Sequence, residues 1–450
     1  MRYCFLLPLV LMIVSCTEKK SPPVIRLMTL DPGHFHAALV QKVHYDGVDT
    51  NVHVFAPEGQ DLIQHLERVD RYNHRESEPT HWAEHIYIGP DYLDKMVSQK
   101  PGNLVVIAGN NRLKSQYISR SLQAGLNVLA DKPMIILPGE FAELEAAFRT
   151  AREKGVLLYD IMTERFEINS MLQRELAQDE DVFGDLEAGS PQDPAVIKES
   201  IHYFRKVVSG KPLIRPSWFF DPAQQGEGIV DVTTHLVDLV QWTCFPDRIL
   251  NHRSDVVVLN AERSATPLTL SQFGAVTGMN SFPGFLSPAP GDSVVQVFSN
   301  GAFTYTLKGV HARVSVRWDY FAGEGRGDSH YSLMRGSRSS LVIRQGEEQG
   351  FRPVLYIEPK VGDEAFGKSV ERALQRMQAA FPGIQAVSEG DRFRIDVPKG
   401  LQTDHEAHFA QVMERYLSFI RNGGMPEWEV PNMLTKYYTT TEALRIAGQP

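Results

Sequence analysis

The sequence predicts an α/β fold, in which a doubly wound parallel sheet is followed by an α+β domain with a large, mainly antiparallel open sheet. The first observation is the run at 103–108, which is typical of a parallel strand buried on both faces. The second is the alternation of short strands and amphipathic helices between residues 24 and 159, at the spacing of right-handed βαβ units. The third is the change after Arg165, where strands separated by Gly and Pro turns predominate up to Pro359.

The elements of the first part follow from apolar periodicity and from helix stop signals. Gly125 and Gly155 each follow a periodic apolar helix, as expected for residues that end a helix in the left-handed conformation. The polar, His-rich stretch at 72–84 is too irregular to assign. The predicted strands cover 24–30, 52–55, 103–108, 127–130 and 156–159, and the predicted helices cover 36–43, 61–71, 113–122 and 140–154.

The second part is predicted from β-rich runs and two late helices. A loop rich in Asp, Pro and Gly at 178–194 leads into it. We expect domain boundaries at 25–165 and 166–450, because the strand-rich half is consistent with one large sheet. The predicted strands cover 196–204, 293–298, 303–308, 312–318 and 340–344, and the predicted helices cover 405–421 and 434–446.

Composition excludes several classes of protein. The 450 residues include 42% hydrophobic residues, which rules out a collagen, a coiled coil or a disordered chain. Lys and Arg number 46 against 55 Asp and Glu, for a net charge of −9, and no basic stripe is present. The sequence therefore argues against nucleic acid as a partner, because such binding depends on clustered basic residues.

The N-terminus has the features of an export signal. The apolar run at 4–14 is too short to span a bilayer and is followed by Ser15 and Cys16. Residues 13–16 resemble a bacterial lipobox, which implies a signal peptide at 1–15, lipidation of Cys16 and a tether at 16–24. We therefore expect an exported, membrane-anchored lipoprotein that faces the periplasm. The alternative is a plain secretory signal with a chance cysteine.

Two motifs carry a family resemblance. Residues 105–111 read Val-Val-Ile-Ala-Gly-Asn-Asn, and 125–133 read Gly-Leu-Asn-Val-Leu-Ala-Asp-Lys-Pro. Residues 226–238 read Gly-Glu-Gly-Ile-Val-Asp-Val-Thr-Thr-His-Leu-Val-Asp. In this order they resemble the Gfo/Idh/MocA oxidoreductase family over roughly residues 25–245. The chain departs from the family pattern at Asp131, where Glu is usual, and at Thr233, where Gly is usual.

The resemblance implies a Rossmann domain and a nicotinamide cofactor, but the cofactor loop is unusual. After the first strand only Gly33 remains of the usual three glycines. Glu58 is placed to accept a hydrogen bond from a ribose 2′-hydroxyl, which favours NAD over NADP. We expect the cofactor to be bound by Asp31, Gly33, His34, Phe35, His36, Glu58, Asn110, Asn111, Asp131, Lys132 and Pro133.

A metal site is the alternative use of the same loop. His34 and His36, with Asp31 and a distant His, would supply ligands. A two-residue spacing of histidines is not itself a ligand geometry, so no metal is assigned.

The expected chemistry is hydride transfer from an alcohol, which needs a base for the hydroxyl proton. His235 suits this role, and Asp231, four residues earlier, could orient the imidazole on one helix face, with Asp238 further along it. Lys132 could polarise the substrate hydroxyl. In the alternative interpretation, Asp231, His235 and Asp238 form a surface pair with a cap, and Lys132 and Pro133 merely end a strand.

Aromatic and basic residues near the second sheet predict a sugar site. We expect substrate contacts from Arg165, His202, Arg205, Lys206, Trp218, Asp231 and His235. The alternative is a sheet edge with solvated charges and a core Trp.

The function that we predict is oxidation of a sugar or glycoside hydroxyl, at C3 in the best specific case, to a keto sugar by tightly held, recycled NAD. The rivals are a redox-neutral NAD-dependent glycosidase on the same fold and a sugar-binding lipoprotein that has lost its cofactor. A homo-oligomer that forms through the C-terminal sheet is a further expectation.

Overall fold

The computed structural model describes residues 24–208, 211–286, 288, 293–324 and 326–449. Cys16 and the predicted signal peptide and tether, apart from residue 24, lie outside these residues. Within the described ranges, no helix is long and apolar enough to cross a membrane.

The first half is a six-stranded, all-parallel sheet in the order β3-β2-β1-β4-β5-β6. This order reverses between β1 and β4, which is the point where doubly wound folds bind ligands. The central strands are fully buried because helices cover both faces. The strands are β1 Leu27–Leu30, β2 Asn51–Ala56, β3 Ala83–Ile88, β4 Leu104–Ile107, β5 Asn127–Asp131 and β6 Leu158–Ile161.

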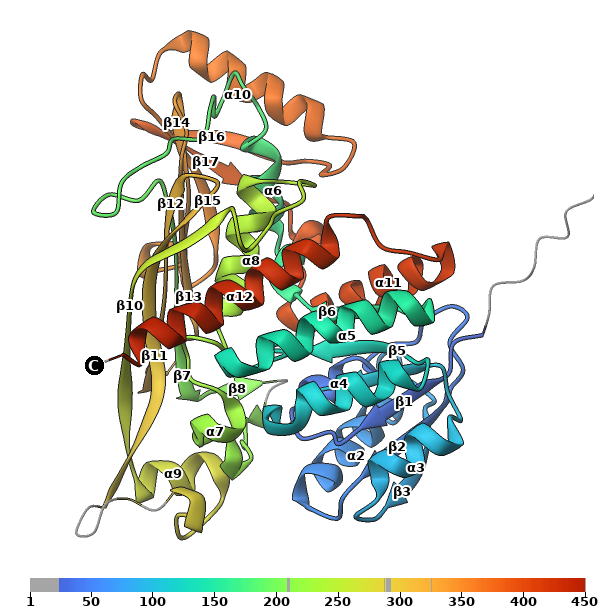
Figure 1. Ribbon diagram of the computed structural model, residues 1–450. Coiled ribbons are helices and arrows are strands. Elements are labelled where there is room, and N and C mark those ends of the chain that lie inside the picture. The colour runs from blue at the N-terminus through green and yellow to red at the C-terminus, as the bar shows by residue number, and fades with distance from the viewer. Residues whose placement is uncertain (1–23, 209–210, 287, 289–292, 325, 450) are drawn as a thin grey trace, which may run out of the picture.

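Five α-helices connect these strands, and Figure 1 shows them around the sheet at the lower right. Gly155 ends α5 with φ +66°, as the sequence predicts. The helices are α1 His36–Leu39, α2 Gln60–Asn73, α3 Tyr92–Gln99, α4 Lys114–Gln123 and α5 Phe141–Lys154, with 3-10 turns η1 Asn111–Leu113, η2 Pro138–Glu140 and η3 Thr163–Phe166.

The second half is a nine-stranded sheet in the order β10-β11-β12-β7-β13-β14-β15-β17-β16, in which only the β12–β7 pair is parallel. The predicted fold class is therefore confirmed. The strands are β7 Val196–Arg205, β10 Val256–Thr269, β11 Val294–Leu307, β12 Val310–Phe321, β13 Ser329–Arg335, β14 Ser339–Arg344, β15 Val354–Pro359, β16 Gln385–Glu389 and β17 Arg392–Asp396, with a separate small pair β8 Val207–Val208 and β9 Lys211–Pro212.

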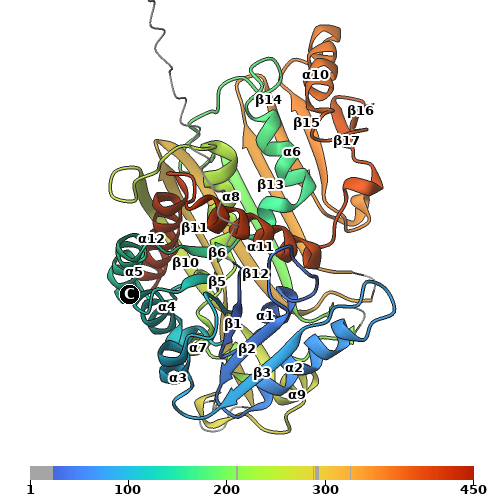
Figure 2. The ribbon, with the colours of Figure 1, turned by 90° about the vertical axis from the view of Figure 1, so that its right-hand side faces the viewer.

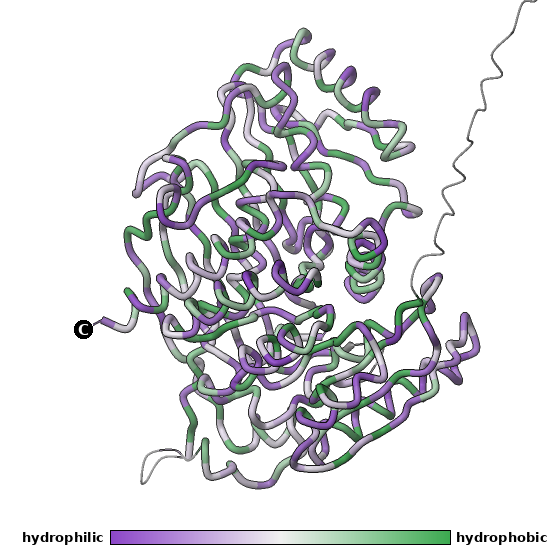
Figure 3. Tube along the Cα trace, turned by 45° about the vertical axis from the view of Figure 1, so that its right-hand side comes forward, coloured by the Kyte–Doolittle hydropathy of each residue, from purple (hydrophilic) through white to green (hydrophobic). Residues whose placement is uncertain are grey.

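Helices α6, α8 and α12 lie on one face of the large sheet, to its right in Figure 1. Along α10 the apolar residues recur on one buried face, and Figure 3 shows hydrophobic and hydrophilic stretches alternating around the surface helices. The remaining helices are α6 Ile168–Leu176, η4 Ser217–Phe220, α7 Pro222–Gln225, α8 Thr233–Cys244, α9 Leu270–Thr277, η5 Gly284–Leu286, η6 Glu347–Gln349, α10 Glu364–Met377, η7 Lys399–Leu401, α11 His405–Asn422 and α12 Glu429–Ala447.

The C-terminal helices return to the first half of the chain. Phe409, Val412 and Tyr416 of α11 belong to the same hydrophobic core as β1, β4 and β5. The Tyr416 hydroxyl donates to the carbonyl oxygens of Val128 at 3.0 Å and Leu157 at 2.7 Å. Figure 2 shows α11 and α12 crossing between the two sheets. The C-terminal helices therefore pack with the first half of the chain, although a domain boundary at residue 165 would assign them to the second.

Candidate functional site

The candidate site lies at the carboxyl ends of β1, β4 and β5, where the second half of the chain packs against the first. The turn after β5 contributes Lys132, and the segment before α8 contributes Asp231. The Lys132 Nζ donates to Asp231 Oδ1 at 2.5 Å, and both side chains are about nine-tenths buried. Gln225 Nε2 donates to the other Asp231 oxygen at 3.0 Å. The structure therefore brings together two predicted catalytic residues that are 99 positions apart.

The predicted hydrogen bond between Asp231 and His235 is wrong. Helix α8 begins only at Thr233, so Asp231 precedes the helix, and its carboxylate is directed to Lys132 and Gln225 instead. The Nδ1 atom of His235 is buried and has no hydrogen-bond partner among the described residues. Burial, followed by the positive charge of Lys132, lowers the pKa of His235 well below its usual range. The imidazole is therefore neutral at pH 7 and able to accept a proton.

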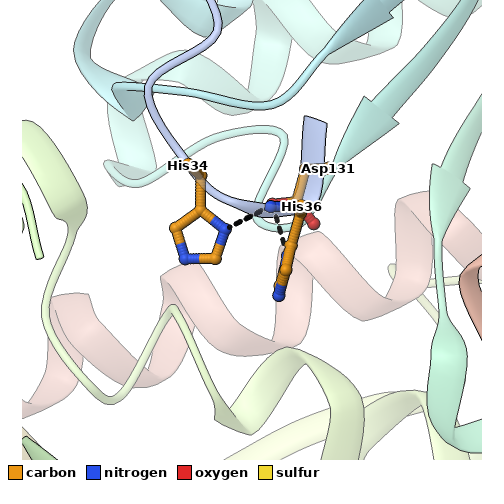
Figure 4. Close-up of side chains that lie close together, drawn as sticks. All are labelled: His34, His36 and Asp131. Atoms are coloured by element: carbon orange, nitrogen blue, oxygen red, sulfur yellow. Dashed lines mark hydrogen bonds and ion pairs between the residues drawn. The ribbon is translucent and has the colours of Figure 1, made fainter. Parts of the chain in front are cut away.

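A second cluster consists of His34 in the β1–α1 loop, His36 at the start of α1 and Asp131 at the end of β5 (Figure 4). The His36 Nδ1 lies 2.9 Å from Asp131 Oδ2, and the His34 Nδ1 lies 3.7 Å from the same oxygen. Burial is the largest cause that lowers the pKa of each histidine well below its usual range. Both imidazoles are thus neutral beside the carboxyl group of Asp131.

Lys114 is a site residue that the sequence analysis missed. Its side chain is fully buried at the start of α4, and its Nζ donates to the Asp131 carbonyl oxygen at 2.9 Å. Desolvation lowers the pKa of Lys114 to about 8. In the sequence Lys114 stands three residues after Asn111, and nothing in the pattern around it indicates a buried site residue.

The cofactor loop retains the backbone of a dinucleotide turn despite its single glycine. Asp31 occupies the left-handed region with φ +46°, a conformation that Asp tolerates better than most residues. Its carboxylate accepts from the Tyr117 hydroxyl at 2.7 Å, and burial raises the pKa of Asp31. A Cβ at Gly109 would come within 2.2 Å of the Asp31 carbonyl oxygen, so β1 and β4 can meet here only through a glycine.

Trp218 and Asp61 cover Gly33 of this loop. A Cβ at Gly33 would lie 2.9 Å from Asp61 Oδ2 and 3.1 Å from Trp218 Cζ2. The indole Nε1 of Trp218 donates to Asp61 Oδ2 at 2.7 Å, and burial raises the pKa of Asp61 to about 6. Trp218, predicted to bind substrate, therefore lies on the cofactor loop. Asp61 was missed, although it stands in the first turn of a predicted helix, three residues after Glu58.

The other predicted cofactor residues lie around this loop, with different freedom to bind a ligand. Glu58 is exposed just beyond β2. Asn110 Nδ2 donates to Gln224 Oε1 at 2.8 Å, and Asn111 Nδ2 donates to the Gln225 carbonyl at 2.6 Å. These two amides thus connect η1 to α7. The Phe35 ring contacts both imidazoles, His34 at 4.6 Å and His36 at 4.5 Å between ring centres, and Pro133 follows Lys132 through a cis peptide bond.

Arg165 has a structural position instead of the predicted substrate contact. Its guanidinium donates to both carboxylate oxygens of Asp238, at 2.6 and 2.7 Å, and to Glu429 at 3.1 and 3.2 Å. Lys436 contacts Asp238 at 2.9 Å and Asp160 at 2.7 Å. All five groups are buried, so the guanidinium of Arg165 is directed into an internal charge network and the predicted substrate role is corrected.

The predicted substrate strand β7 divides its residues between two faces. His202 Nδ1 and Lys206 Nζ lie 2.8 and 2.9 Å from the same oxygen of Asp328. Arg205 is exposed and stacks on Phe321 at 4.6 Å from the ring centre. Because side chains alternate along a strand, Arg205 faces away from His202 and Lys206, which corrects its expected place beside them.

Glu164 and His405 form an additional acid–base pair that the sequence did not indicate. The His405 Nε2 lies 3.6 Å from Glu164 Oε1. Burial, with the nearby charges of Glu167 and Asp328, raises the pKa of Glu164 to about 7. The charges of Lys132 and Lys206 act on both Glu164 and His405, which places the pair close to the Lys132 site.

Two observations show that the site fits a dinucleotide. The site lies where the strand order reverses between β1 and β4, and the buried Nδ1 of His235 lacks a partner among the described residues. Residues of the β1–α1 loop and Glu58 would hold the nucleotide, and Lys132 and His235 would border its reactive end.

The family models match both halves of the chain. The model described as "Putative oxidoreductase C terminal domain" matches residues 172–448. The model described as "Oxidoreductase family, NAD-binding Rossmann fold" matches residues 58–160. The second match begins after the unusual loop that contains Gly33.

The chain is also similar to individual oxidoreductases. A solved structure described as a "putative oxidoreductase from Parabacteroides merdae ATCC 43184" is 48% identical, with a TM-score of 0.92. The alignment covers 95% of this chain and 98% of that chain. "Uncharacterized oxidoreductase YhhX" of Escherichia coli K12 is 26% identical over 148 residues, which is 33% of this chain. The match spans only 39% of that relative's length.

A more distant solved structure shares the fold alone. Levoglucosan dehydrogenase in complex with NADH and levoglucosan is 13% identical with a TM-score of 0.60. The alignment covers 94% of this chain and 97% of that one. The fold, the two family models and the 48% identical relative together lead to one conclusion: the chain belongs to the Gfo/Idh/MocA family of NAD-binding oxidoreductases.

Proposed function

We propose that this oxidoreductase oxidises a hydroxyl group of a sugar or glycoside, with C3 as the favoured position, to give a keto sugar. The observation that carries the proposal is the Lys132 ammonium, held at 2.5 Å by Asp231, together with a neutral His235 whose Nδ1 has no hydrogen-bond partner in the described part of the chain. Hydride acceptance is the chemistry that a bound nicotinamide dinucleotide supplies. An exposed Glu58 at the end of β2 favours NAD over NADP.

In this proposal the side chains divide the proton chemistry between them. Lys132 donates a hydrogen bond to the substrate hydroxyl and stabilises the negative charge that develops on its oxygen. His235 accepts the hydroxyl proton, because its pKa keeps it unprotonated at working pH. Asp231 keeps the Lys132 ammonium in position.

A sugar is proposed because the second half of the chain presents aromatic and charged groups on the same side as the Lys132 site. His202 stacks on Trp318 with ring centres 5.0 Å apart, and Lys206 shares Asp328 with His202. The partly exposed His202, Lys206 and Asp328 offer hydrogen-bonding groups that suit a polyhydroxylated ring. The fold likeness to levoglucosan dehydrogenase is consistent with such a substrate.

We also propose that Cys16 carries a lipid anchor and that the protein faces the periplasm. A compartment without a free nicotinamide pool requires the cofactor to remain bound and to be recycled in place. The helix-free face of the large sheet, on the left in Figure 1, carries a hollow of about 660 Å³, and we expect it to pair with a second copy.

A redox-neutral NAD-dependent glycosidase is the second candidate, and Glu164 with His405 favours it. This pair offers an acid and a base that alcohol oxidation alone does not require. A keto group at C3 acidifies the neighbouring C–H bond, so such a pair could assist departure of the glycosidic oxygen.

Product analysis distinguishes these functions. The purified full chain is incubated with a nitrophenyl glucoside and an electron acceptor, and the products are identified by mass spectrometry. Loss of two hydrogens from the intact glucoside supports the dehydrogenase. Release of the aglycone without net oxidation supports the glycosidase and contradicts the first proposal. An unchanged glucoside, with binding retained, indicates a sugar-binding protein.

A further inference from the structure

The His34–His36–Asp131 cluster has a geometry that the dehydrogenase chemistry does not require. One ligand-type atom from each side chain lies within 4.8 Å of the other two. The two imidazole nitrogens lie 2.9 and 3.7 Å from a single carboxylate oxygen, and all three side chains are at least 86% buried. Figure 4 shows the three side chains close together, with dashed lines that include the contact of His34 Nδ1 with the backbone N–H of His36.

These separations are close to those of a metal centre. Zn²⁺ lies about 2.0–2.2 Å from nitrogen and oxygen ligands, so two ligands of a tetrahedral ion are separated by about 3.4 Å. The measured 2.9 and 3.7 Å lie on either side of that value. Shifts of a few tenths of an ångström would therefore accommodate an ion.

Neighbouring groups hold the carboxylate and one of the imidazoles in place. The backbone N–H of Lys132 donates to the other Asp131 oxygen at 2.9 Å, which fixes the orientation of the carboxylate. His36 is held further by Phe409, whose ring centre lies 4.5 Å away.

The ammonium groups of Lys132 and Lys114 have partners other than the Asp131 carboxylate oxygen that faces the histidines. Lys132 is paired with Asp231, and Lys114 is directed to the Asp131 backbone carbonyl instead of its carboxylate. Neither ammonium group therefore occupies the Asp131 oxygen that faces the two histidines.

We propose that His34, His36 and Asp131 bind one divalent transition-metal ion of the Zn²⁺ class, with coordination positions left for water or a substrate oxygen. Two imidazoles and one carboxylate form the donor set of catalytic zinc and non-haem iron(II) centres, whereas Mg²⁺ and Ca²⁺ prefer oxygen ligands alone. The carboxylate is Asp131 of β5 and not Asp31, which is engaged with Tyr117. The site would place an ion beside the Lys132 turn.

The test measures metal binding and not turnover. The full chain, without an affinity tag, is stripped with a chelator, dialysed and titrated with Co²⁺, whose visible absorption reports coordination by protein ligands; Zn²⁺ is then added in competition. We expect one equivalent of Co²⁺ per chain, displaced by Zn²⁺. His34→Gln and Asp131→Asn should each weaken binding by about 100-fold or more. The exposed control variants His85→Gln and Asp94→Asn should bind as the wild type does.

Folding is checked by circular dichroism and thermal unfolding of each variant. If Asp131→Asn fails to fold, His34→Gln decides the outcome, because His34 is the most exposed of the three side chains. Absence of stoichiometric binding by the wild type would overturn the proposal. Equal binding by folded His34→Gln and wild type would overturn it too.

Discussion

Lys132 and His235 differ in how their surroundings control a proton. The Lys132 ammonium is neutralised by Asp231 at 2.5 Å, so it can act as a hydrogen-bond donor in a buried place. His235 has no such partner among the described residues, and burial together with Lys132 keeps it unprotonated. The pair thus combines a fixed donor with a free acceptor, which is the division of labour that alcohol oxidation needs.

Removing the acceptor should affect chemistry more than folding. We expect His235→Ala to lower kcat/KM by about 10²–10⁴-fold, the usual contribution of a general base. The wild-type rate should show no loss between pH 8 and 6, because the pKa of His235 lies well below that window. Steady-state kinetics across pH measures both effects, with His85→Gln as the control. A wild-type rate that halves near pH 6.5 would show that the base has an ordinary histidine pKa.

Glu164 gives a stability prediction with a defined sign. Its pKa is raised to about 7 from the 4.5 of a free Glu, so the folded state favours the protonated carboxyl. The contribution of the Glu164 carboxyl to the stability of the fold is present in full below pH 4.5 and is lost as the pH rises through 7. Glu164→Gln should therefore raise the melting temperature more at pH 8 than at pH 5. Thermal unfolding at the two pH values checks this, and an equal shift at both would contradict it.

At the scale of the element, apolar pattern predicted the buried strands and failed at the edges. Strands β1, β4 and β5 are fully or almost fully buried, and each was found from its apolar run. Strand β3 lies at the sheet edge with most side chains exposed, so its sequence resembles a loop and was left unassigned, as was α3. The predicted strands at 293–298 and 303–308 are one strand, β11, because the polar segment between them stays paired with β10.

The site could be predicted only in part, because local sequence patterns do not reveal which distant residues meet. Motifs located the β5 turn and the start of α8, and so both Lys132 and Asp231. Which groups meet there depends on the packing of the two halves. The Lys132–Asp231 pair and the position of Trp218 on Gly33 join residues about 100 or more apart, and no local spacing reveals them.

The β1–α1 loop offers a test of close packing at a glycine. Gly33→Ala adds a Cβ 2.9 Å from Asp61 and 3.1 Å from Trp218, so we expect a loss of about 1–3 kcal/mol in stability and less bound nucleotide. Gly59→Ala is the matched control, because nothing lies within 4 Å of its added Cβ. Denaturant unfolding compares the two variants. Equal stability of both would mean that Trp218 and Asp61 do not close over Gly33.

At the scale of the whole molecule, a buried charge network joins the two halves. Arg165 and Asp160 come from the first half, Asp238 from α8, and Glu429 and Lys436 from α12. An intact network of this kind adds little to the free energy of unfolding, because the cost of desolvating the charges offsets their attraction. Removal of one partner is costly, because it leaves the other buried charges uncompensated. It therefore fixes how α12 is placed against the Rossmann domain.

Lys436→Met should destabilise the protein by about 3–5 kcal/mol, because it leaves the buried carboxylates of Asp160 and Asp238 without the ammonium group that now contacts both. Lys368→Met, at an exposed pair with Glu364, should change stability by less than about 1 kcal/mol. Denaturant unfolding of both variants provides the measurement. A Lys436→Met variant as stable as the Lys368→Met control would show that the network does not hold α12.

The most direct test of the account is the redox state of the nucleotide that the protein carries. Full-length protein is purified without added nucleotide, mixed with a glucoside, denatured, and the supernatant is assayed for NAD(H) and NADP(H). We predict close to one equivalent of NAD(H) per chain, which becomes more reduced after the glucoside is added to wild type but not to His235→Ala. Absence of nucleotide, or a redox state that no sugar changes, would contradict the proposal that this site oxidises a sugar hydroxyl.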